Sequence, residues 1–457
     1  MINLKFIPVC LFGIILLFFT ACKNNNNSGK VGIRGKIVNP KKDHIIISRD
    51  FLRISSDTLF LLDGNEVKDR INIDEEGLYF IEIFPEFQTI YLRPDDSLAF
   101  HINVEEFDES LSFSGSLGFE NNLLIELFLA NENESEFFYQ NNFHFTRLEF
   151  IRKIDSFTQI QNRILTNNEN EFNKTGKKFK EIINLTRNSI HYSLAEEYLK
   201  KYPDSIFDGK FAEIHRILHR NLPDPNIIYM YAFADKYLER KIGSDPSCGN
   251  NLYYEIGKKI NEELKDKDFK DNMLLKYCYK YLKDNLIYQS DSITDYYFHS
   301  FNNPSYVAYC QNIIQKNEKL HIGKRFPDIE IIDAEGIKHR LNELLEKQSL
   351  ITFWDLNRRK NFISNLNKLN EIKKQFPGLR ILILNINPGE FDEWLLQLPK
   401  FKNFDYYQIT GSQAVNIIKP FHLSQIFLLS NDTIKLSMYN MYKPDFQDKL
   451  KELSLNP

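Results

Sequence analysis

The cysteines are considered first, because a thiolate is the attacking group in thiol–disulfide exchange. The chain of 457 residues has five of them, Cys10, Cys22, Cys248, Cys278 and Cys310. None of their spacings is the C-x-x-C of a redox pair or that of a zinc knuckle. No cysteine follows Cys310. We interpret Cys278 and Cys310, which lie in apolar helical surroundings, as buried packing residues.

Two histidines have a spacing that metal sites use. His215 and His219 are four residues apart and would share one face of a helix. The segment lacks the glutamate that an H-E-x-x-H motif places after its first histidine, and Arg216 and Arg220 would repel a cation. We therefore interpret the segment as a solvated basic helix face and expect no metal.

Asp57, Asp95 and Asp96 are carboxylates of the kind that calcium prefers. They lack the D-x-[DN]-x-[DN]-G spacing of a calcium loop, and turn chemistry explains them better.

The overall composition does not indicate any other class of ligand. A net charge of -4 and a pI near 6.3 give no basic footprint for nucleic acid, and we expect no cofactor.

The elements nearest the C-terminus predict an α/β domain. Ser349 to Trp354 is a continuous apolar run that suits a buried parallel strand. A hairpin is predicted before it, from Ile329 to Ile332 and from Ile337 onward, around the turn that ends at Gly336. After it we predict a strand at Leu379–Ile386, a helix at Glu390–Leu398, a hairpin of Ile426–Leu429 and Thr433–Met438, and a helix at Pro444–Leu453.

This region resembles the membrane-tethered TlpA-like and AhpC/TSA-like thioredoxins. The resemblance rests on Gly323-Lys324-Arg325-Phe326-Pro327-Asp328, on the pair Leu341 and Leu344, and on Phe353-Trp354. In that family a C-x-x-C follows at the start of a helix, where the helix N-terminus lowers the pKa of the thiol. Here Arg358 and Asn361 stand nearest the two cysteine positions. The resemblance thus implies a thioredoxin-like fold without the redox motif.

The family also places a cis-proline before the first strand of the terminal hairpin. Ser424 occupies that position here. A peptide bond before serine strongly prefers the trans form, so we expect a trans bond. Two departures at one site predict a redox-inactive domain with no catalytic residue.

Arg358, Arg359 and Lys360 raise an alternative use of the same site. They would lie at a helix N-terminus, where free backbone N–H groups favour anions. Together with Asn361 they are a possible anion site for a carboxylate or phosphate of a partner. The alternative, which we favour, is a solvated run of charges.

The N-terminus resembles that of a bacterial lipoprotein. Lys5 precedes an apolar stretch from Ile7 to Phe19, which has the length of a signal peptide. Phe19-Thr20-Ala21-Cys22 resembles a lipobox, which implies lipid attachment at Cys22; an ordinary signal with an incidental cysteine is the alternative. We expect the cell envelope, on the periplasmic side of a membrane and most simply the outer membrane, with the membrane as one partner through the lipid.

Two different sequence patterns lie between this anchor and the thioredoxin-like end. Short alternating runs between turns at residues 31–118 predict an antiparallel β-sandwich. Phrases such as Tyr91-Leu92-Arg93-Pro94 resemble a domain of unknown function that precedes thioredoxin domains in Bacteroidota lipoproteins. Residues 119–319 carry long helical patterns, namely Leu148–Leu165, Phe179–Leu199, Phe211–Asn221, Ile227–Lys241, Leu252–Leu264 and Met273–Tyr288.

The predicted organisation is therefore multidomain. It comprises a signal peptide (1–21), a flexible tether (22–30), the sandwich (31–118), an all-α region (119–319) and the thioredoxin-like domain (320–457). We interpret the protein as a lipid-anchored binding or scaffolding module for an unknown periplasmic protein or peptide. The alternative is an oxidoreductase that borrows Cys248, Cys278 or Cys310, which would require an exposed thiol near the former motif.

Overall fold

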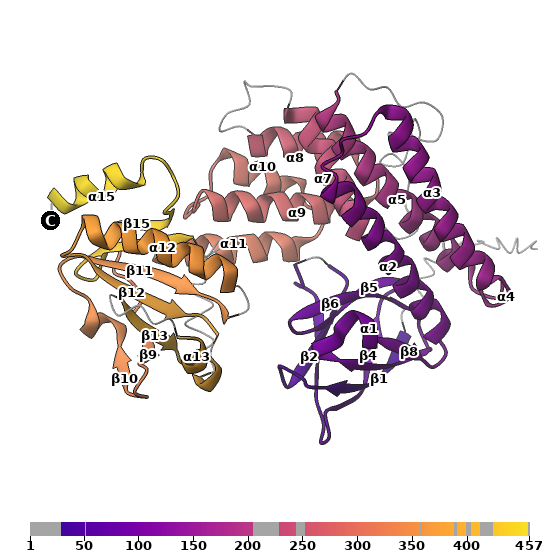
Figure 1. Ribbon diagram of the computed structural model, residues 1–457, viewed down its shortest axis with the longest axis horizontal. Helices are drawn as coiled ribbons and strands as arrows, with labels where there is room; N and C mark the ends of the chain where they lie inside the picture. Colours follow the sequence, from indigo (N-terminus) through magenta and orange to yellow (C-terminus); the bar gives the residue numbers. More distant parts are fainter. Residues whose placement is uncertain are drawn as a thin grey trace, which may run out of the picture.

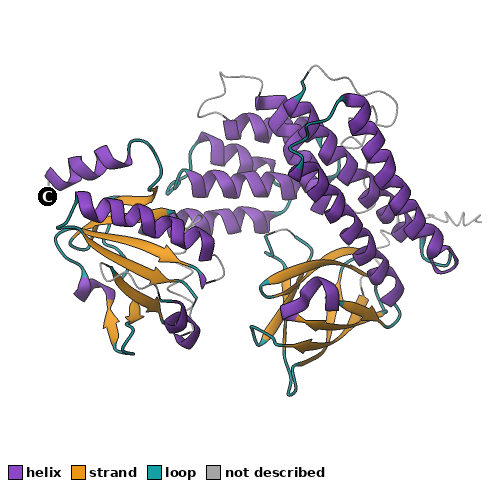
Figure 2. Ribbon diagram, viewed as in Figure 1, coloured by secondary structure: helices purple, strands orange, loops and turns teal. Residues whose placement is uncertain are grey.

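Three parts follow one another in the computed structural model: a sandwich of strands, a group of helices, and a mixed sheet flanked by helices (Figures 1 and 2). The structure describes residues 29–50, 52–203, 228–243, 252–356, 359–387, 391–398, 404–411 and 424–455. The helices lie between the two β-containing parts (Figure 2).

The sandwich is built from eight strands in two four-stranded sheets, with the orders β4-β1-β7-β8 and β3-β2-β5-β6. The strands are β1 (Gly29–Val38), β2 (His44–Ser48), β3 (Ser56–Phe60), β4 (Glu66–Ile73), β5 (Gly77–Ile83), β6 (Glu86–Leu92), β7 (Ser97–Asn103) and β8 (Ser112–Ser114). Alternation decides which face is buried: Val31, Ile33 and Ile37 point into the core of the sandwich. Gly35 is required, because a Cβ there would lie 2.1 Å from the ring of Phe100.

Two expectations about this part were wrong in detail. The first strand begins at Gly29, so residues 29 and 30 belong to the sandwich and not to the tether. The sandwich is also not purely antiparallel, because β1 pairs in parallel with β7. All of β2 to β6 lies between these two strands in the chain, which gives the long connection that a parallel pair needs.

The helical part begins where the sandwich ends. A short 3-10 turn, η1 (Val104–Glu106), and helix α1 (Phe107–Ser110) precede β8. The helices that follow are α2 (Gly118–Gln140), α3 (Arg147–Asn167), α4 (Glu169–Phe172), α5 (Lys177–Lys201), α7 (Ile228–Gly243), α8 (Leu252–Glu263), α9 (Lys267–Asp284), α10 (Ser292–Ser300) and α11 (Pro304–Lys319). Side-chain caps define several starts, such as the capping box of Thr146 and Glu149 on α3.

One predicted helix was found with different bounds. The pattern Met273–Tyr288 gave an end that was too late, because α9 stops at Asp284 and Leu286 adopts a left-handed φ of 48°. Asp266 caps the true start by accepting a hydrogen bond from the Phe269 N–H at 2.9 Å. The predicted helix Phe211–Asn221 lies outside the described residues.

The C-terminal part contains a seven-stranded sheet with the order β10-β9-β13-β12-β11-β14-β15. Its elements are β9 (Glu330–Ile332), β10 (Lys338–Arg340), η4 (Leu341–Leu344), β11 (Ser349–Trp354), α12 (Arg359–Gln375), β12 (Arg380–Asn385), α13 (Phe391–Gln397), β13 (Asp405–Ile409), β14 (Gln425–Ser430), β15 (Thr433–Asn440) and α15 (Phe446–Leu455). Strand β11 pairs in parallel with β12 and antiparallel with β14, and β15 pairs antiparallel with β14. This is the thioredoxin-like arrangement that the sequence implied, with β13 added.

The buried apolar clusters do not coincide with the three parts that follow one another along the chain. One buried cluster runs from Val31 in the sandwich to Ile314 in α11, so the sandwich and the helices share a core. Two further clusters lie on opposite faces of the seven-stranded sheet, one around Phe353 and the other around Trp354. The helical part therefore packs as an extension of the sandwich, and the thioredoxin-like end has cores of its own.

Candidate functional site

The expected site lies where β11 ends and α12 begins. All six residues of β11 are buried, and its carboxyl end meets the start of α12 at Arg359. Arg358 lies outside the described residues, and for Arg359, Lys360 and Asn361 the structure describes the backbone of α12 but not the side chains. The possible anion site thus stays a prediction.

Polar side chains gather at the carboxyl ends of β11, β12 and β13, beside this junction. Asn387 is their centre: its Oδ1 accepts from the Leu356 N–H at 3.0 Å, and its Nδ2 donates to Asp355 Oδ1 at 3.4 Å. Gln408 Nε2 donates to the Asn387 carbonyl at 2.6 Å. The Asn387 N–H in turn donates to Asn385 Oδ1 at 3.1 Å. These bonds hold the ends of three neighbouring strands together.

Two buried donors at this edge have no hydrogen-bond partner among the described residues. They are Trp354 Nε1 and Asn385 Nδ2, which belong to residues paired across β11 and β12. The Trp354 ring stacks on Phe362 of α12 at 4.3 Å between ring centroids. The described part of this edge thus offers amide and indole donors and the Asp355 carboxylate, but no thiol. Sequence reasoning missed Asn385 and Asn387, although asparagines at the end of an apolar strand and just after it were a visible signal.

Ser424, which stands where the family has its cis-proline, is half-buried in a turn just before β14. Its carbonyl accepts from the Met441 N–H at 3.1 Å, which continues the pairing of the terminal hairpin. Leu423, the other half of the preceding peptide bond, lies outside the described residues. The trans bond before Ser424 therefore stays a prediction.

The described cysteines are enclosed. Cys278 on α9 and Cys310 on α11 both have 0% exposure, as expected for packing residues. A hydrogen bond with the Cys310 thiol, together with burial, raises the pKa of Cys278 well above its ordinary value. A thiol of raised pKa that solvent cannot reach is a poor nucleophile. Cys22 and Cys248 lie outside the described residues.

The remaining sequence candidates do not form metal sites in the part of the chain that the structure describes. His215 and His219 lie outside it. Asp95 occupies a turn with a φ of 65°, and Asp96 pairs with Arg93. Asp57 lies on β3, where burial and then the charge of Asp69 raise the pKa of its carboxyl. No group of three metal-ligating side chains occurs among the described residues.

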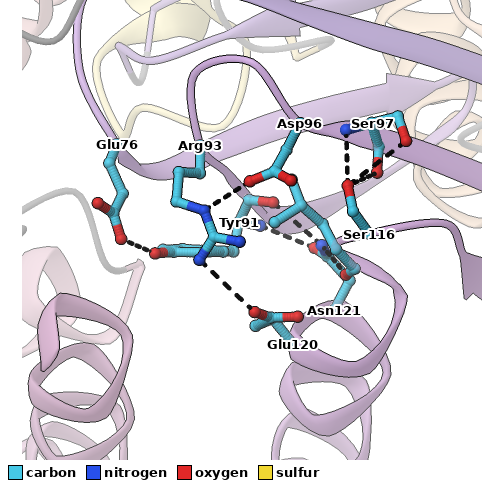
Figure 3. A network of polar contacts seen from close by, with 9 residues as sticks. Glu76, Tyr91, Arg93, Asp96, Ser97, Ser116, Glu120 and Asn121 are labelled. Carbon is cyan, nitrogen blue, oxygen red and sulfur yellow. Dashed lines mark hydrogen bonds and ion pairs between the residues drawn. The ribbon is translucent and has the colours of Figure 1, made fainter. Parts of the chain in front are cut away.

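A polar network joins the sandwich to the helices (Figure 3). The Tyr91 hydroxyl donates to Glu76, and Arg93 Nε donates to Asp96 Oδ2 at 2.5 Å. Arg93 also lies 3.9 Å from Glu120 Oε1 at the start of α2, and burial raises the pKa of the Glu120 carboxyl. The charged groups of this network face one another, so we interpret it as a structural joint.

Comparisons with known proteins found similarity only at the level of structure. No family model matches the chain, and no curated protein does. A conserved protein of unknown function from Bacteroides fragilis is 16% identical, with 29% of this chain and 98% of that chain covered and a TM-score of 0.23. A putative thiol-disulfide oxidoreductase from Bacteroides vulgatus is 17% identical, with 29% of this chain and 97% of that chain covered and a TM-score of 0.26. A domain of a possible thiol-disulfide isomerase from Cytophaga hutchinsonii is 16% identical, with 30% of this chain and 95% of that chain covered and a TM-score of 0.25.

Proposed function

We propose that the protein is a binding or scaffolding module whose thioredoxin-like end performs no thiol–disulfide exchange. The observation that carries the proposal is the junction between β11 and α12. Residues Asp355 to Asn361 contain no cysteine, in the place where the resembling family has its redox pair. Exchange passes through a mixed disulfide, which a site without a cysteine of its own cannot form.

The buried cysteines argue against the competing function, an oxidoreductase with a borrowed thiol. Such a thiol has to be exposed and close to the former motif, whereas Cys278 and Cys310 have no exposed surface. Both also belong to the core that the helices share with the sandwich, and not to the cores of the thioredoxin-like end. Of the three cysteines considered for that alternative, Cys248 is the one that could still supply the borrowed thiol.

The proposal includes attachment to the cell envelope. The lipobox-like Phe19-Thr20-Ala21-Cys22 supports a lipid at Cys22, with the folded part on the periplasmic side of a membrane. No helix in the described part of the chain is long and apolar enough to cross a bilayer. We expect the partner to be a periplasmic protein or peptide and expect no nucleic acid. Labelling with a radioactive fatty acid, abolished by Cys22→Ala, tests the anchor.

An insulin-reduction assay with dithiothreitol tests the redox part of the proposal. The full chain and its Cys248→Ser/Cys278→Ser/Cys310→Ser variant are compared with reagent alone and with an active thioredoxin. We expect both forms to match the reagent background. Activity in the natural chain that the triple variant loses would replace this proposal with the oxidoreductase.

A further inference from the structure

A large hollow lies on the sandwich, far along the chain from the thioredoxin-like end. It has a volume of about 870 Å³ and opens on the outer face of the sheet β4-β1-β7-β8. We propose that this hollow binds a small ligand with two or more acidic groups, such as phosphates, sulfates or carboxylates. The proposal is independent of the function proposed for the other end.

Strand register explains why the sheet is hollowed here. Gly32 on β1 lies between Arg70 on β4 and Ser97 on β7, and Arg34 lies between Lys68 and Ala99. Glycine and alanine give the centre of the face almost no side-chain bulk, while the longer side chains rise from β1 and β4. A ligand can therefore approach the backbone of β1 and β7 between polar walls.

Three cations line the hollow, and no acidic residue in the described part of the chain forms an ion pair with them. Arg34, Lys68 and Arg70 are exposed, and none of them forms an ion pair with a described residue. Arg34 and Lys68 stand directly opposite each other on antiparallel strands, an arrangement of like charges that costs stability. An anion bound between them would remove that repulsion. By contrast, Lys36 in the next row is paired with Glu66 at 3.8 Å.

Three acidic residues also line the hollow, and once the pairing of Asp96 with Arg93 is allowed for, the three cations face two carboxylates. Asp96 is held by Arg93 at 2.5 Å. Asp69 alternates with Lys68 and Arg70 along β4, and it acts on Asp57 of the other sheet, where it raises the pKa of that carboxyl. Asp95 also lines the hollow, and its Oδ1 would be 3.2 Å from a Cβ at Gly29.

The opposite wall supplies hydroxyl groups at fixed positions. Ser116 Oγ accepts from the Ser97 N–H at 2.9 Å and donates to the Ser97 carbonyl at 3.2 Å (Figure 3). Gly115 makes this turn possible, because its φ is 89° and a Cβ would lie 3.0 Å from the Ser97 carbonyl oxygen. Ser97 and Ser116 can thus contact the uncharged part of a ligand.

The spacing of the three cations sets the spacing that we expect between the acidic groups of the ligand. Lys68 and Arg70 are two residues apart on one strand, which separates them by about 7 Å. Arg34 faces Lys68 across the strand pair, with about 5 Å between their Cβ atoms. A ligand whose acidic groups lie about 5–7 Å apart would therefore contact all three cations, whereas a single small ion would fill only part of the hollow.

Isothermal titration calorimetry on the full chain at low salt tests this proposal. Tripolyphosphate, sucrose octasulfate and trigalacturonate are titrated separately, so that the arm with the tightest binding identifies the acidic group. We expect at least one to bind, with affinity that falls as sodium chloride is added. The variant Arg34→Ala/Lys68→Ala/Arg70→Ala should weaken that binding at least ten-fold.

Two further variants separate the hollow from general charge and from misfolding. Lys258→Ala/Lys319→Ala/Lys374→Ala removes the same charge from exposed lysines elsewhere and should leave binding unchanged. Gly32→Leu keeps every charge but fills the floor, and its Cβ would meet only ordinary contacts, 3.7 Å or more away. It should abolish binding while the far-ultraviolet circular dichroism stays natural. No heat with any of the three ligands, or equal loss in the lysine control, would overturn the proposal.

Discussion

Asn121 and Asn122 are consecutive on α2, yet each hydrogen bonds the backbone of a different sheet. Asn121 accepts from the Tyr91 N–H at 2.7 Å and donates to the Tyr91 carbonyl at 3.0 Å. Asn122 makes the same pair of bonds, both 2.9 Å, with Phe113. Tyr91 lies on β6 and Phe113 on β8, which are edge strands of the two sheets. The start of α2 thus takes the place of a neighbouring strand on both sheets at once.

This arrangement predicts that substitutions of the two adjacent asparagines lower the free energy of unfolding by different amounts. Asn121 is fully buried, so Asn121→Leu leaves two backbone groups unpaired away from water and should lower the free energy of unfolding by about 2–4 kcal/mol. Asn122 is exposed, and water can replace its bonds, so Asn122→Leu should cost about 1 kcal/mol or less. Urea denaturation followed by circular dichroism measures both. Equal costs would contradict the assigned roles.

The separation of the apolar cores predicts independent unfolding. The chain has two tryptophans, Trp354 and Trp394, and both are buried in one core of the thioredoxin-like end. Tryptophan fluorescence therefore reports on that end alone. In Asn121→Leu the transition seen by circular dichroism should move to lower urea, while the fluorescence transition stays in place. A parallel shift of both signals would show that the two ends unfold as one unit.

The buried pair of Glu134 and His191 predicts a strongly non-additive double-mutant cycle. His191 Nε2 lies 3.2 Å from Glu134 Oε2, and both side chains are almost wholly enclosed. His191→Leu leaves the buried glutamate without its partner and should lower the free energy of unfolding by about 3–5 kcal/mol. Glu134→Leu/His191→Leu removes both polar groups and should lower the free energy of unfolding by less than that single change does. Additive costs would mean that the two residues do not act as a pair.

Glu120 predicts a specific dependence of stability on pH. Burial raises the pKa of its carboxyl above the ordinary 4.5, so the folded protein holds that proton more tightly than the unfolded chain does. The resulting stabilisation is complete below pH 4.5 and is lost as the pH rises through the folded pKa. Glu120→Gln, which cannot ionise, should therefore be more stable than the natural chain at pH 7.

The matched control for that experiment is Glu132→Gln. Glu132 lies on the same helix but is exposed, so its replacement should leave the stability unchanged across the pH range. The gain of Glu120→Gln, measured by thermal unfolding, should shrink as the pH falls toward 4. A gain that is the same at every pH would show that ionisation of Glu120 is not its cause.

Local patterns predicted most of the elements, and long-range contacts account for what was missed. Alternation and turn residues identified the strands of the sandwich, but not the parallel pairing of β1 with β7, because no local pattern encodes which distant strand becomes a neighbour. Strand β13 was missed because Asp-Tyr-Tyr-Gln-Ile is short and half polar. The bonds of Asn121 and the set around Asn387 join side chains to distant backbone, which sequence periodicity does not record.

Mixed-disulfide formation is the most direct test of the central claim that this chain does not exchange disulfides. The Cys10→Ser/Cys22→Ser variant, which keeps Cys248, Cys278 and Cys310, is incubated with glutathione disulfide, and its intact mass is measured before and after denaturation. On the claim that the folded chain has no accessible thiol, and with Cys278 and Cys310 enclosed, we expect no glutathione adduct on the native protein and adducts only once it is unfolded. An adduct that forms on the folded chain would contradict it, because an accessible attacking thiol would then be present.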